Sequence, residues 1–256
     1  MKKLHSLVLL SCLFFLVSAC QKNDVSPSSE SGTSSQSGTG GSLARSTIVN
    51  NTMYFVDNST MQVYDLSTKT DPKLINKVQI FSSSIETIYA LDNYLYLGSS
   101  NGMFIYDISS KFNPRYLSMA THASGCDPVV SDGKYAYVTV RNTIACNRMN
   151  SLNILAIYDV TNPTSPKEIS NLSLIEPIGL AIDGNNLFVC DKGAIKIIDV
   201  SNKNNPKIIK SIISNAYDII INKGNIITVG NDGITQYEYN SQTLELIYKS
   251  KIQTVL

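Results

Sequence analysis

Histidine is almost absent from this chain of 256 residues, which contains only His5 and His122. His5 lies in an apolar leader, so His122 is the one histidine beyond it, and only Cys126 is close to it in sequence. No Ser-His-Asp or Cys-His set can be built without His122, and a zinc site would need several His or Cys ligands. A glycine-rich phosphate loop is also missing. The sequence therefore gives no support for a hydrolase or a dinucleotide enzyme.

An excess of charge of one sign is missing too. The chain carries 21 Lys and Arg against 20 Asp and Glu, a formal net charge of +1. Nucleic-acid-binding proteins normally present a basic face, so we expect no nucleic-acid partner. No stretch shows a convincing period of 3.6 residues, and 43% of the residues are hydrophobic. This composition favours a β-rich core.

The first 20 residues have the pattern of a bacterial secretory signal. Met1-Lys2-Lys3 is basic, Leu7 to Val17 is apolar, and small residues follow. The apolar run is too short for a transmembrane helix, which needs about 20 residues. The end, Leu16-Val17-Ser18-Ala19-Cys20, resembles the lipobox of bacterial lipoproteins. That resemblance implies cleavage of a signal peptide, residues 1–19, and attachment of lipid chains to Cys20, which would anchor the protein to a membrane.

The residues after Cys20 indicate the destination. Gln21, rather than Asp, follows the cysteine, so by resemblance to Gram-negative sorting rules the inner-membrane retention signal is missing. We expect an outer-membrane lipoprotein. The run from Gln21 to Asp24 resembles surface-export signals as much as a plain polar linker. The sequence therefore does not choose between the inner and the outer leaflet of the outer membrane. Residues 20–42 are rich in Ser and Gly and form the expected flexible tether.

The remaining residues, 43–256, contain one motif five times. Each copy has an apolar strand, a Gly/Asn/Asp turn, and a second alternating strand that ends in an acid. The acids are Asp65, Asp107, Asp159, Asp199 and Glu238, with spacings of 42, 52, 40 and 39 residues. A further strand precedes and another follows each motif. Four strands per ~43 residues predict an all-β fold, a β-propeller of about five four-stranded blades. No strand is exchanged between the ends, so an incompletely closed array is the alternative.

The repeats resemble the LVIVD-repeat family of bacterial and archaeal cell-surface proteins. The tract Ile195-Lys196-Ile197-Ile198-Asp199-Val200-Ser201-Asn202 fits its motif closely, and Ile105 to Ser109 and Ile157 to Pro163 fit nearly as well. The resemblance weakens in the last repeat, where Glu238 replaces Asp. It implies a propeller and a surface location, and it implies no reaction.

The repeated acids are best interpreted as turn residues. Acids on equivalent strand ends can accept backbone N–H bonds in the Asp-x-Ser/Thr/Asn turn that follows. The tyrosines before them, Tyr64, Tyr106 and Tyr158, are expected to pack between blades.

We expect a disulfide between Cys126 and Cys146. An exported protein sits in an oxidising compartment, where such a bond persists. Antiparallel pairing about the turn at Asp132-Gly133 puts the two cysteines at the same end of a hairpin. Cys190 lies within an expected strand and is interpreted as a small buried residue.

One face of the propeller is expected to carry the recognition loops. In propellers, the entries into the innermost strands share a face with the turns between second and third strands. Here that face receives the segment around His122 and the longer loop from Arg141 to Ser151, with Arg141 and Arg148 as candidate ligand-binding residues. A long loop is a common place for function, although drift in a surface loop would look the same.

A ring of charged residues is predicted at the channel mouth. Alignment of the innermost strands places Arg45, Glu86, Asp127 and Asp218 at equivalent positions, with Glu176 and His122 close by. Converging carboxylates would repel one another or recruit a cation, and Glu86, Asp127 and Asp218 would suit Ca²⁺ as a cofactor. In the alternative interpretation, each acid caps backbone amides at a strand entry.

Two classes of function follow. The first is a binding or scaffolding module displayed on the envelope, with an envelope protein or a glycan as its partner. The second is an extracellular hydrolase that uses carboxylates on the upper face, for example on a carbohydrate polymer. A purely structural envelope protein is a third class. Because no catalytic set is evident, the binding module is preferred and no catalytic residue is assigned.

Overall fold

The computed structural model describes residues 40–81, 84–121, 128–142 and 152–254. Every described residue belongs to one compact unit, Ser35–Leu256. No helix in the described ranges is long and apolar enough to cross a membrane.

The described strands form five antiparallel sheets of four strands each. We number these sheets blades 1 to 5 in chain order. Blade 1 contains β1 (Ser46–Val49), β2 (Thr52–Asp57), β3 (Thr60–Asp65) and β4 (Lys73–Gln79). Blade 2 contains β5 (Ile85–Leu91), β6 (Tyr94–Ser99), β7 (Gly102–Asp107) and β8 (Arg115–Thr121). Blade 3 contains β9 (Val129–Ser131), β10 (Tyr135–Val140), β11 (Ile154–Asp159) and β12 (Lys167–Ser173). Blade 4 contains β13 (Pro177–Asp183), β14 (Asn186–Asp191), β15 (Ala194–Asp199) and β16 (Lys207–Ile213). Blade 5 contains β17 (Ala216–Asn222), β18 (Asn225–Gly230), β19 (Gly233–Asn240) and β20 (Glu245–Ile252).

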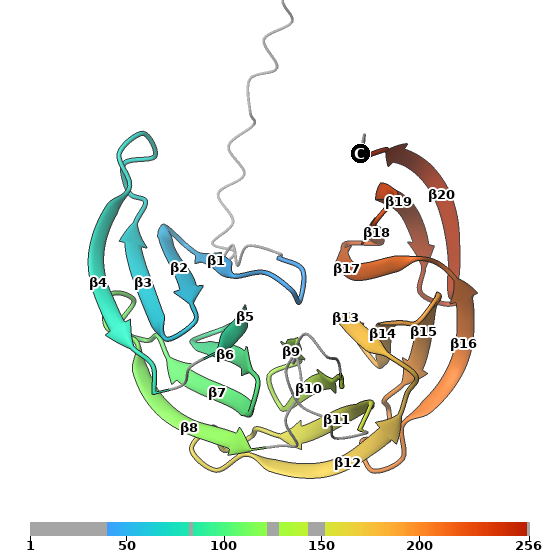
Figure 1. Ribbon diagram of the computed structural model, residues 1–256, viewed down its shortest axis with the longest axis horizontal. Coiled ribbons are helices and arrows are strands. Elements are labelled where there is room, and N and C mark those ends of the chain that lie inside the picture. Colours follow the sequence, from blue (N-terminus) through green and yellow to red (C-terminus); the bar gives the residue numbers. More distant parts are fainter. Residues whose placement is uncertain (1–39, 82–83, 122–127, 143–151, 255–256) are drawn as a thin grey trace, which may run out of the picture. The chain divides into compact units, whose positions relative to one another are not determined.

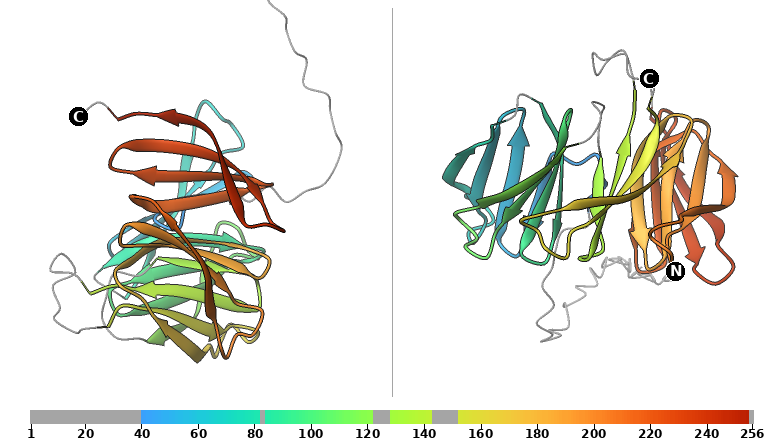
Figure 2. Two further views of the ribbon diagram at one scale, coloured as in Figure 1. Left: turned by 90° about the vertical axis from the view of Figure 1, so that its right-hand side faces the viewer. Right: turned by 90° about the horizontal axis from the view of Figure 1, so that it is seen from below.

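The blades are arranged around a centre, as a propeller requires. Their first strands, β1, β5, β9, β13 and β17, lie innermost, and their fourth strands lie at the periphery (Figure 1). Seen edge-on, the strands run between two faces of the propeller (Figure 2). Each sheet is built from four consecutive strands, without exchange between the ends. The prediction of an all-β propeller with five four-stranded blades is therefore confirmed.

The same kind of side-chain pair holds each blade to the next. On the face toward the following blade, an aromatic residue of the second strand lies opposite an aliphatic residue of the third. The pairs are Tyr54 with Val63, Tyr96 with Ile105, Tyr137 with Ile157, and Phe188 with Ile197. All eight side chains are at most 1% exposed. Alternation along a strand sends every second residue to one face, which is why the period-2 pattern encodes these interfaces.

The repeated acids form turns, as predicted. Asp65, Asp107, Asp159 and Asp199 each accept a hydrogen bond from the backbone N–H two residues later, at 2.8–2.9 Å. Hydrogen bonds from the following Ser or Thr hydroxyl and backbone N–H lower the pKa of each carboxyl group. These acids therefore shape the chain between the third and fourth strands.

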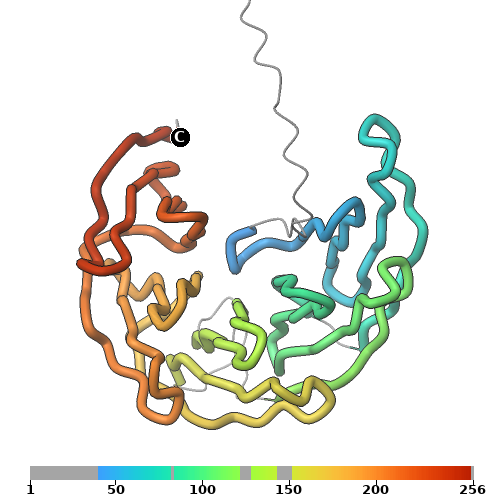
Figure 3. Tube along the Cα trace, turned by 180° about the vertical axis from the view of Figure 1, so that it is seen from behind, coloured from blue at the N-terminus to red at the C-terminus, as the bar shows by residue number. Residues whose placement is uncertain are grey.

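The ring is open between blade 5 and blade 1 (Figure 3). Among the described residues, hydrophobic clusters join blades 1 and 2, 2 and 3, 3 and 4, and 4 and 5, but no cluster joins 5 to 1. Both faces at the opening carry glutamine at a central position. Gln236 of blade 5 is exposed where blades 1 to 4 bury Val63, Ile105, Ile157 and Ile197. On blade 1, Gln62 accepts a hydrogen bond from the Tyr64 hydroxyl at 2.7 Å. Polar outer faces of this kind are typical of terminal repeats.

Exchanging the same position in blades 4 and 5 tests this opening. Ile197→Gln would bury an amide without a partner and remove apolar contacts, so we expect a loss of about 3 kcal/mol in the free energy of unfolding. Gln236→Ile, at the equivalent position, should change it by less than about 0.5 kcal/mol because the site is exposed. Urea unfolding measures both. A gain of several kcal/mol from Gln236→Ile would mean that blades 5 and 1 pack together.

Candidate functional site at the interface of blades 4 and 5

The segment that leads into β1 enters the centre of the ring. The Ala44 carbonyl oxygen accepts a hydrogen bond from the Ile88 N–H of β5 at 2.9 Å. The Ser42 hydroxyl donates to Asp218 Oδ1 of β17 at 3.1 Å and accepts from the Leu180 N–H of β13 at 2.8 Å. Ser42 is 1% exposed. Residues 40–45, which we call the lead-in segment, therefore connect the innermost strands of blades 2, 4 and 5.

Asp218 accepts most of the hydrogen bonds that the lead-in segment donates. Besides the Ser42 hydroxyl, its carboxylate accepts hydrogen bonds from the Ile219 N–H at 2.9 Å and from the backbone N–H groups of Ser42 and Leu43. Burial raises the pKa of Asp218, and these hydrogen bonds oppose that rise. A Cβ atom on Gly41 or on Gly179 would collide with the carboxylate, so both positions need glycine.

Asp218 is one of the carboxylates predicted at the channel mouth. Asp218 is 7% exposed and bonded to the lead-in segment. A small cavity of about 50 Å³ adjoins Gly40 of this segment. Its lining residues carry no charge; they are Gly40, Tyr89, Val130, Leu180, Ala181, Ile182, Ile219, Ile220 and Ile221. Asp218 thus fits the alternative interpretation, an acid that caps backbone amides.

Two further residues of the predicted ring lie within the described ranges. Arg45 is exposed, and Glu86 is half-buried in β5. Asp127 and His122 lie outside the described residues. Within the described ranges, no three His, Cys, Asp or Glu side chains are close enough to hold a metal ion. The calcium site, which includes Asp127, stays a prediction.

The predicted disulfide, Cys126 to Cys146, and Arg148 also lie outside the described residues. Cys190 lies in β14 as expected, is 1% exposed, and is a free thiol whose pKa is raised by burial. Arg141 is half-buried, and its Nε atom has no hydrogen-bond partner within the described part of the chain.

Two adjoining pockets lie on the face that the sequence predicts to carry the recognition loops. The first, with a volume of about 130 Å³, is the interface pocket. Its lining is Ile213, Ser214, Asn215, Ala216, Thr228, Gly230, Asp232, Gly233, Thr235, Tyr237 and Lys251. The second has a volume of about 310 Å³, and we call it the outer pocket. Its lining is Glu176, Ile178, Lys192, Gly193, Asn215, Ala216, Tyr217, Asn231 and Asp232. The two pockets share Asn215, Ala216 and Asp232.

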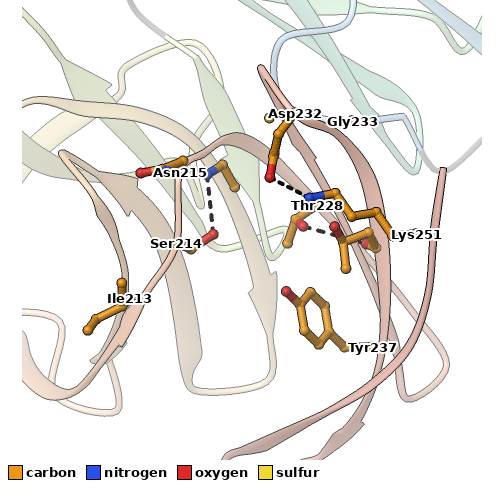
Figure 4. Close-up of a pocket in the computed structure, with 11 residues that line it drawn as sticks. Ile213, Ser214, Asn215, Thr228, Asp232, Gly233, Tyr237 and Lys251 are labelled. Carbon is orange, nitrogen blue, oxygen red and sulfur yellow. Dashed lines mark hydrogen bonds and ion pairs between the residues drawn. The ribbon is translucent and has the colours of Figure 1, made fainter. Parts of the chain in front are cut away.

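Hydroxyl groups dominate the interface pocket. Thr228 of β18 and Thr235 of β19 are cross-strand partners on the face toward blade 4. The Thr228 hydroxyl donates to the Thr235 carbonyl oxygen at 3.5 Å, a long contact. The Tyr237 hydroxyl points into the same space, and Ser214 and Asn215 face it from the other side (Figure 4).

This interface departs from the others at Thr228. The equivalent residues Leu97, Val138 and Val189 are apolar and fully buried against the preceding blade. Thr228 places a hydroxyl at this position, and a polar pocket lies beside it. Sequence reasoning missed this site because threonine fits a strand pattern. Comparing the five repeats column by column would have marked the position.

Two ion pairs border the pockets. Lys251 Nζ pairs with Asp232 Oδ2, an interaction that lowers the pKa of Asp232. Lys192 Nζ lies 3.5 Å from Glu176 Oε2 in the outer pocket. Glu176 is held there because Asp191, 1% exposed, accepts a hydrogen bond from the Glu176 N–H at 2.6 Å. Of the predicted site residues, Glu176 therefore lines a pocket, and each bordering carboxylate has a lysine partner.

Removing the Ser42 hydroxyl should weaken the centre of the ring. Ser42→Ala would leave Asp218 short of one donor and the Leu180 N–H without its acceptor. Because both groups are buried, we expect a loss of about 1–3 kcal/mol in the free energy of unfolding. Ser46→Ala, four residues away and exposed, is the control and should change it by less than about 0.5 kcal/mol. Equal urea midpoints for the two variants would contradict the role given to Ser42.

Stability should depend on pH through Asp218. An acid with a raised pKa in the folded state stabilises the fold most below its unfolded pKa of about 3.9, and this contribution is lost as the pH rises through the folded pKa. Wild-type protein should therefore lose stability relative to Asp218→Asn as the pH rises from about 4.

Asp107 provides a control of opposite sign. Its pKa is lowered to about 2 by hydrogen bonds from Ser109 and from Arg115. Relative to Asp107→Asn, wild-type protein should gain stability as the pH rises from about 2 to about 4. Urea unfolding at several pH values measures both differences. The prediction would be contradicted if the stability of wild-type protein relative to Asp218→Asn stayed constant or increased as the pH rises.

Comparison with known proteins agrees with this fold. A family model of the LVIVD repeat matches residues 85–120, 126–173 and 178–213, the regions of blades 2, 3 and 4. No curated protein matches the chain.

Solved structures resemble the propeller at low sequence identity. A Lactobacillus plantarum protein has 16% identity and a TM-score of 0.64, with 82% of this chain and 74% of that chain covered. A functionally unknown protein from Desulfotomaculum acetoxidans has 11% identity and a TM-score of 0.63, with coverages of 79% and 66%. The periplasmic gluconolactonase PpgL of Pseudomonas aeruginosa has 8% identity and a TM-score of 0.60, with coverages of 79% and 67%. The chain thus spans about two thirds to three quarters of their lengths, and the likeness shows the fold alone. This chain thus carries LVIVD repeats in blades 2 to 4 and has the fold of a five-bladed β-propeller.

Proposed function

We propose that this protein is an envelope-anchored lipoprotein whose propeller serves as a binding module. The observation that carries the proposal is the polar pocket beside Thr228, at a position that is buried and apolar in blades 2 to 4. A buried polar group at such a position costs stability, so its presence favours a functional reason. The recognition surface is then the face with the interface pocket and the outer pocket.

The anchor is supported by the leader. Leu16-Val17-Ser18-Ala19-Cys20 resembles a lipobox, and lipid chains on Cys20 would hold the protein at a membrane. Gln21 in place of Asp favours the outer membrane. The Ser- and Gly-rich residues that follow would act as a tether, allowing the propeller to sit about 25 Å from the bilayer.

Binding is favoured over hydrolysis by the state of the carboxylates. Glycoside hydrolysis uses two acids that flank the bond, one of which gives up a proton. At the two pockets, Glu176 pairs with Lys192 and Asp232 pairs with Lys251. The hydrogen bond from Lys251 lowers the pKa of Asp232, so this carboxylate suits positioning of a polar ligand better than donation of a proton.

Lipid labelling tests the anchor. In cells given alkyne-palmitate, the wild-type protein should be labelled and recovered with membranes, whereas Cys20→Ser should lose both the label and the membrane association. Cys12→Ser, a matched change within the leader, should keep both. Labelled Cys20→Ser protein would overturn the anchoring part of the proposal.

Crosslinking on intact cells tests the binding part. The wild-type protein should crosslink to an envelope component, a protein or a glycan. The double variant Thr228→Val/Thr235→Val should crosslink less, because it removes the pocket hydroxyls. Thr52→Val changes a buried threonine of blade 1 and serves as the control. Equal crosslinking by all three proteins would place the recognition surface elsewhere.

A further inference from the structure

We infer that the interface pocket binds a neutral polyhydroxylated ligand, a saccharide unit of a glycan, with the next unit of that glycan in the outer pocket. This inference rests on the proposed function and names the ligand class of its site. It is supported by the charge, the hydrogen-bonding groups, the fixed position of Tyr237 and the dimensions of the two pockets.

The charge around the two pockets is balanced. Lys251 pairs with Asp232 at the interface pocket, and Lys192 pairs with Glu176 at the outer pocket. Among the described lining residues there is no further Lys, Arg, Asp or Glu. A phosphate or a carboxylate would bring an uncompensated charge, whereas a neutral polar molecule would not. The pockets therefore favour a neutral ligand.

The hydrogen-bonding groups suit hydroxyls. Ser, Thr and Tyr hydroxyls both donate and accept, and the Asn amide offers one acceptor and two donors. Thr228, Thr235, Tyr237 and Asn215 supply such groups around one space. A sugar hydroxyl also donates and accepts, so each can be paired in either direction. The long contact of the Thr228 hydroxyl, 3.5 Å to a carbonyl oxygen, leaves it able to bond a ligand.

Tyr237 presents its hydroxyl beside these groups (Figure 4). Its ring packs edge-on against Tyr248, with the ring centroids 6.3 Å apart and an angle of 78° between the planes. This contact fixes the ring, so little side-chain entropy is lost on binding. The hydroxyl is therefore held in position for a hydrogen bond with a sugar hydroxyl.

The combined size of the two pockets fits more than one saccharide unit. The interface pocket, about 130 Å³, is small and polar, and the outer pocket, about 310 Å³, adjoins it through Asn215 and Asp232. Small-molecule sites usually have about 300–1,000 Å³. Two adjoining pockets that share lining residues suit two consecutive units of a glycan better than a free monosaccharide.

Saccharide binding to the full propeller tests the inference. The probes are glucose, galactose, mannose, N-acetylglucosamine and their β1,4-linked disaccharides, and binding is followed by saturation-transfer NMR and calorimetry. We expect saturable binding of at least one sugar, with the disaccharide at least threefold tighter. Inorganic phosphate and acetate should neither bind nor compete.

Three variants locate the site. Thr228→Val and Thr235→Val should each weaken binding at least fivefold, because valine removes the hydroxyl with little change in shape. Val189 occupies the position of Thr228 in blade 4, so the fold should tolerate the change, and thermal melting checks this. Thr52→Val, with a buried Oγ1 atom that lacks a hydrogen-bond partner within the described ranges, is the matched control and should bind like wild type.

The outcomes separate the inference from the proposed function. The inference fails if no sugar binds, if the threonine variants bind as well as wild type, or if phosphate competes. If crosslinking on cells still depends on Thr228 when no sugar binds, the proposed binding module stands and its ligand belongs to another class. If sugars bind at the pocket while Cys20 carries no lipid, the ligand class stands and the anchoring fails.

Discussion

The hydrogen bonds between Asp218 and the lead-in segment are the interactions on which the geometry of this propeller depends. A closed propeller removes its open edges by packing the last blade on the first. Here that packing is missing among the described residues, and Asp218 instead holds the Ser42 hydroxyl and the backbone N–H groups of Ser42 and Leu43. Because Ala44 also bonds β5, the lead-in segment joins blades 2, 4 and 5 at the centre of the ring.

This central bond explains several sequence choices. Gly41 and Gly179 leave room for the carboxylate of Asp218, which is 7% exposed. The glutamines Gln62 and Gln236 make the two faces at the opening compatible with solvent. The protein therefore holds five blades in register without needing the fifth interface.

The four interfaces that do form show how a repeat accommodates a site. Aromatic and aliphatic pairs such as Phe188 with Ile197 supply the burial that stabilises each interface. Thr228 lies on the face of blade 5 that is directed toward blade 4. A polar residue can replace the usual apolar residue at this position as long as the aromatic and aliphatic pairs remain. A binding pocket can thus form between two blades without loss of the fold, because stability is shared among neighbouring interfaces.

Much of the fold was predictable from the sequence, because period-2 alternation and turn residues act over a few neighbouring positions. The blades, the strand order and the turns at Asp65, Asp107, Asp159 and Asp199 follow from such local signals. The hydrogen bond between Ser42 and Asp218 does not follow from local signals, since these residues are 176 positions apart in the chain. Likewise, the sequence predicts Asp218 near the channel but not the burial that raises its pKa. The pocket at Thr228 required the packing of two blades, because a threonine in a strand is unremarkable until its neighbours show that the same position is otherwise apolar. Local chemistry determined the elements of this protein, and only the tertiary structure decided which of their side chains meet.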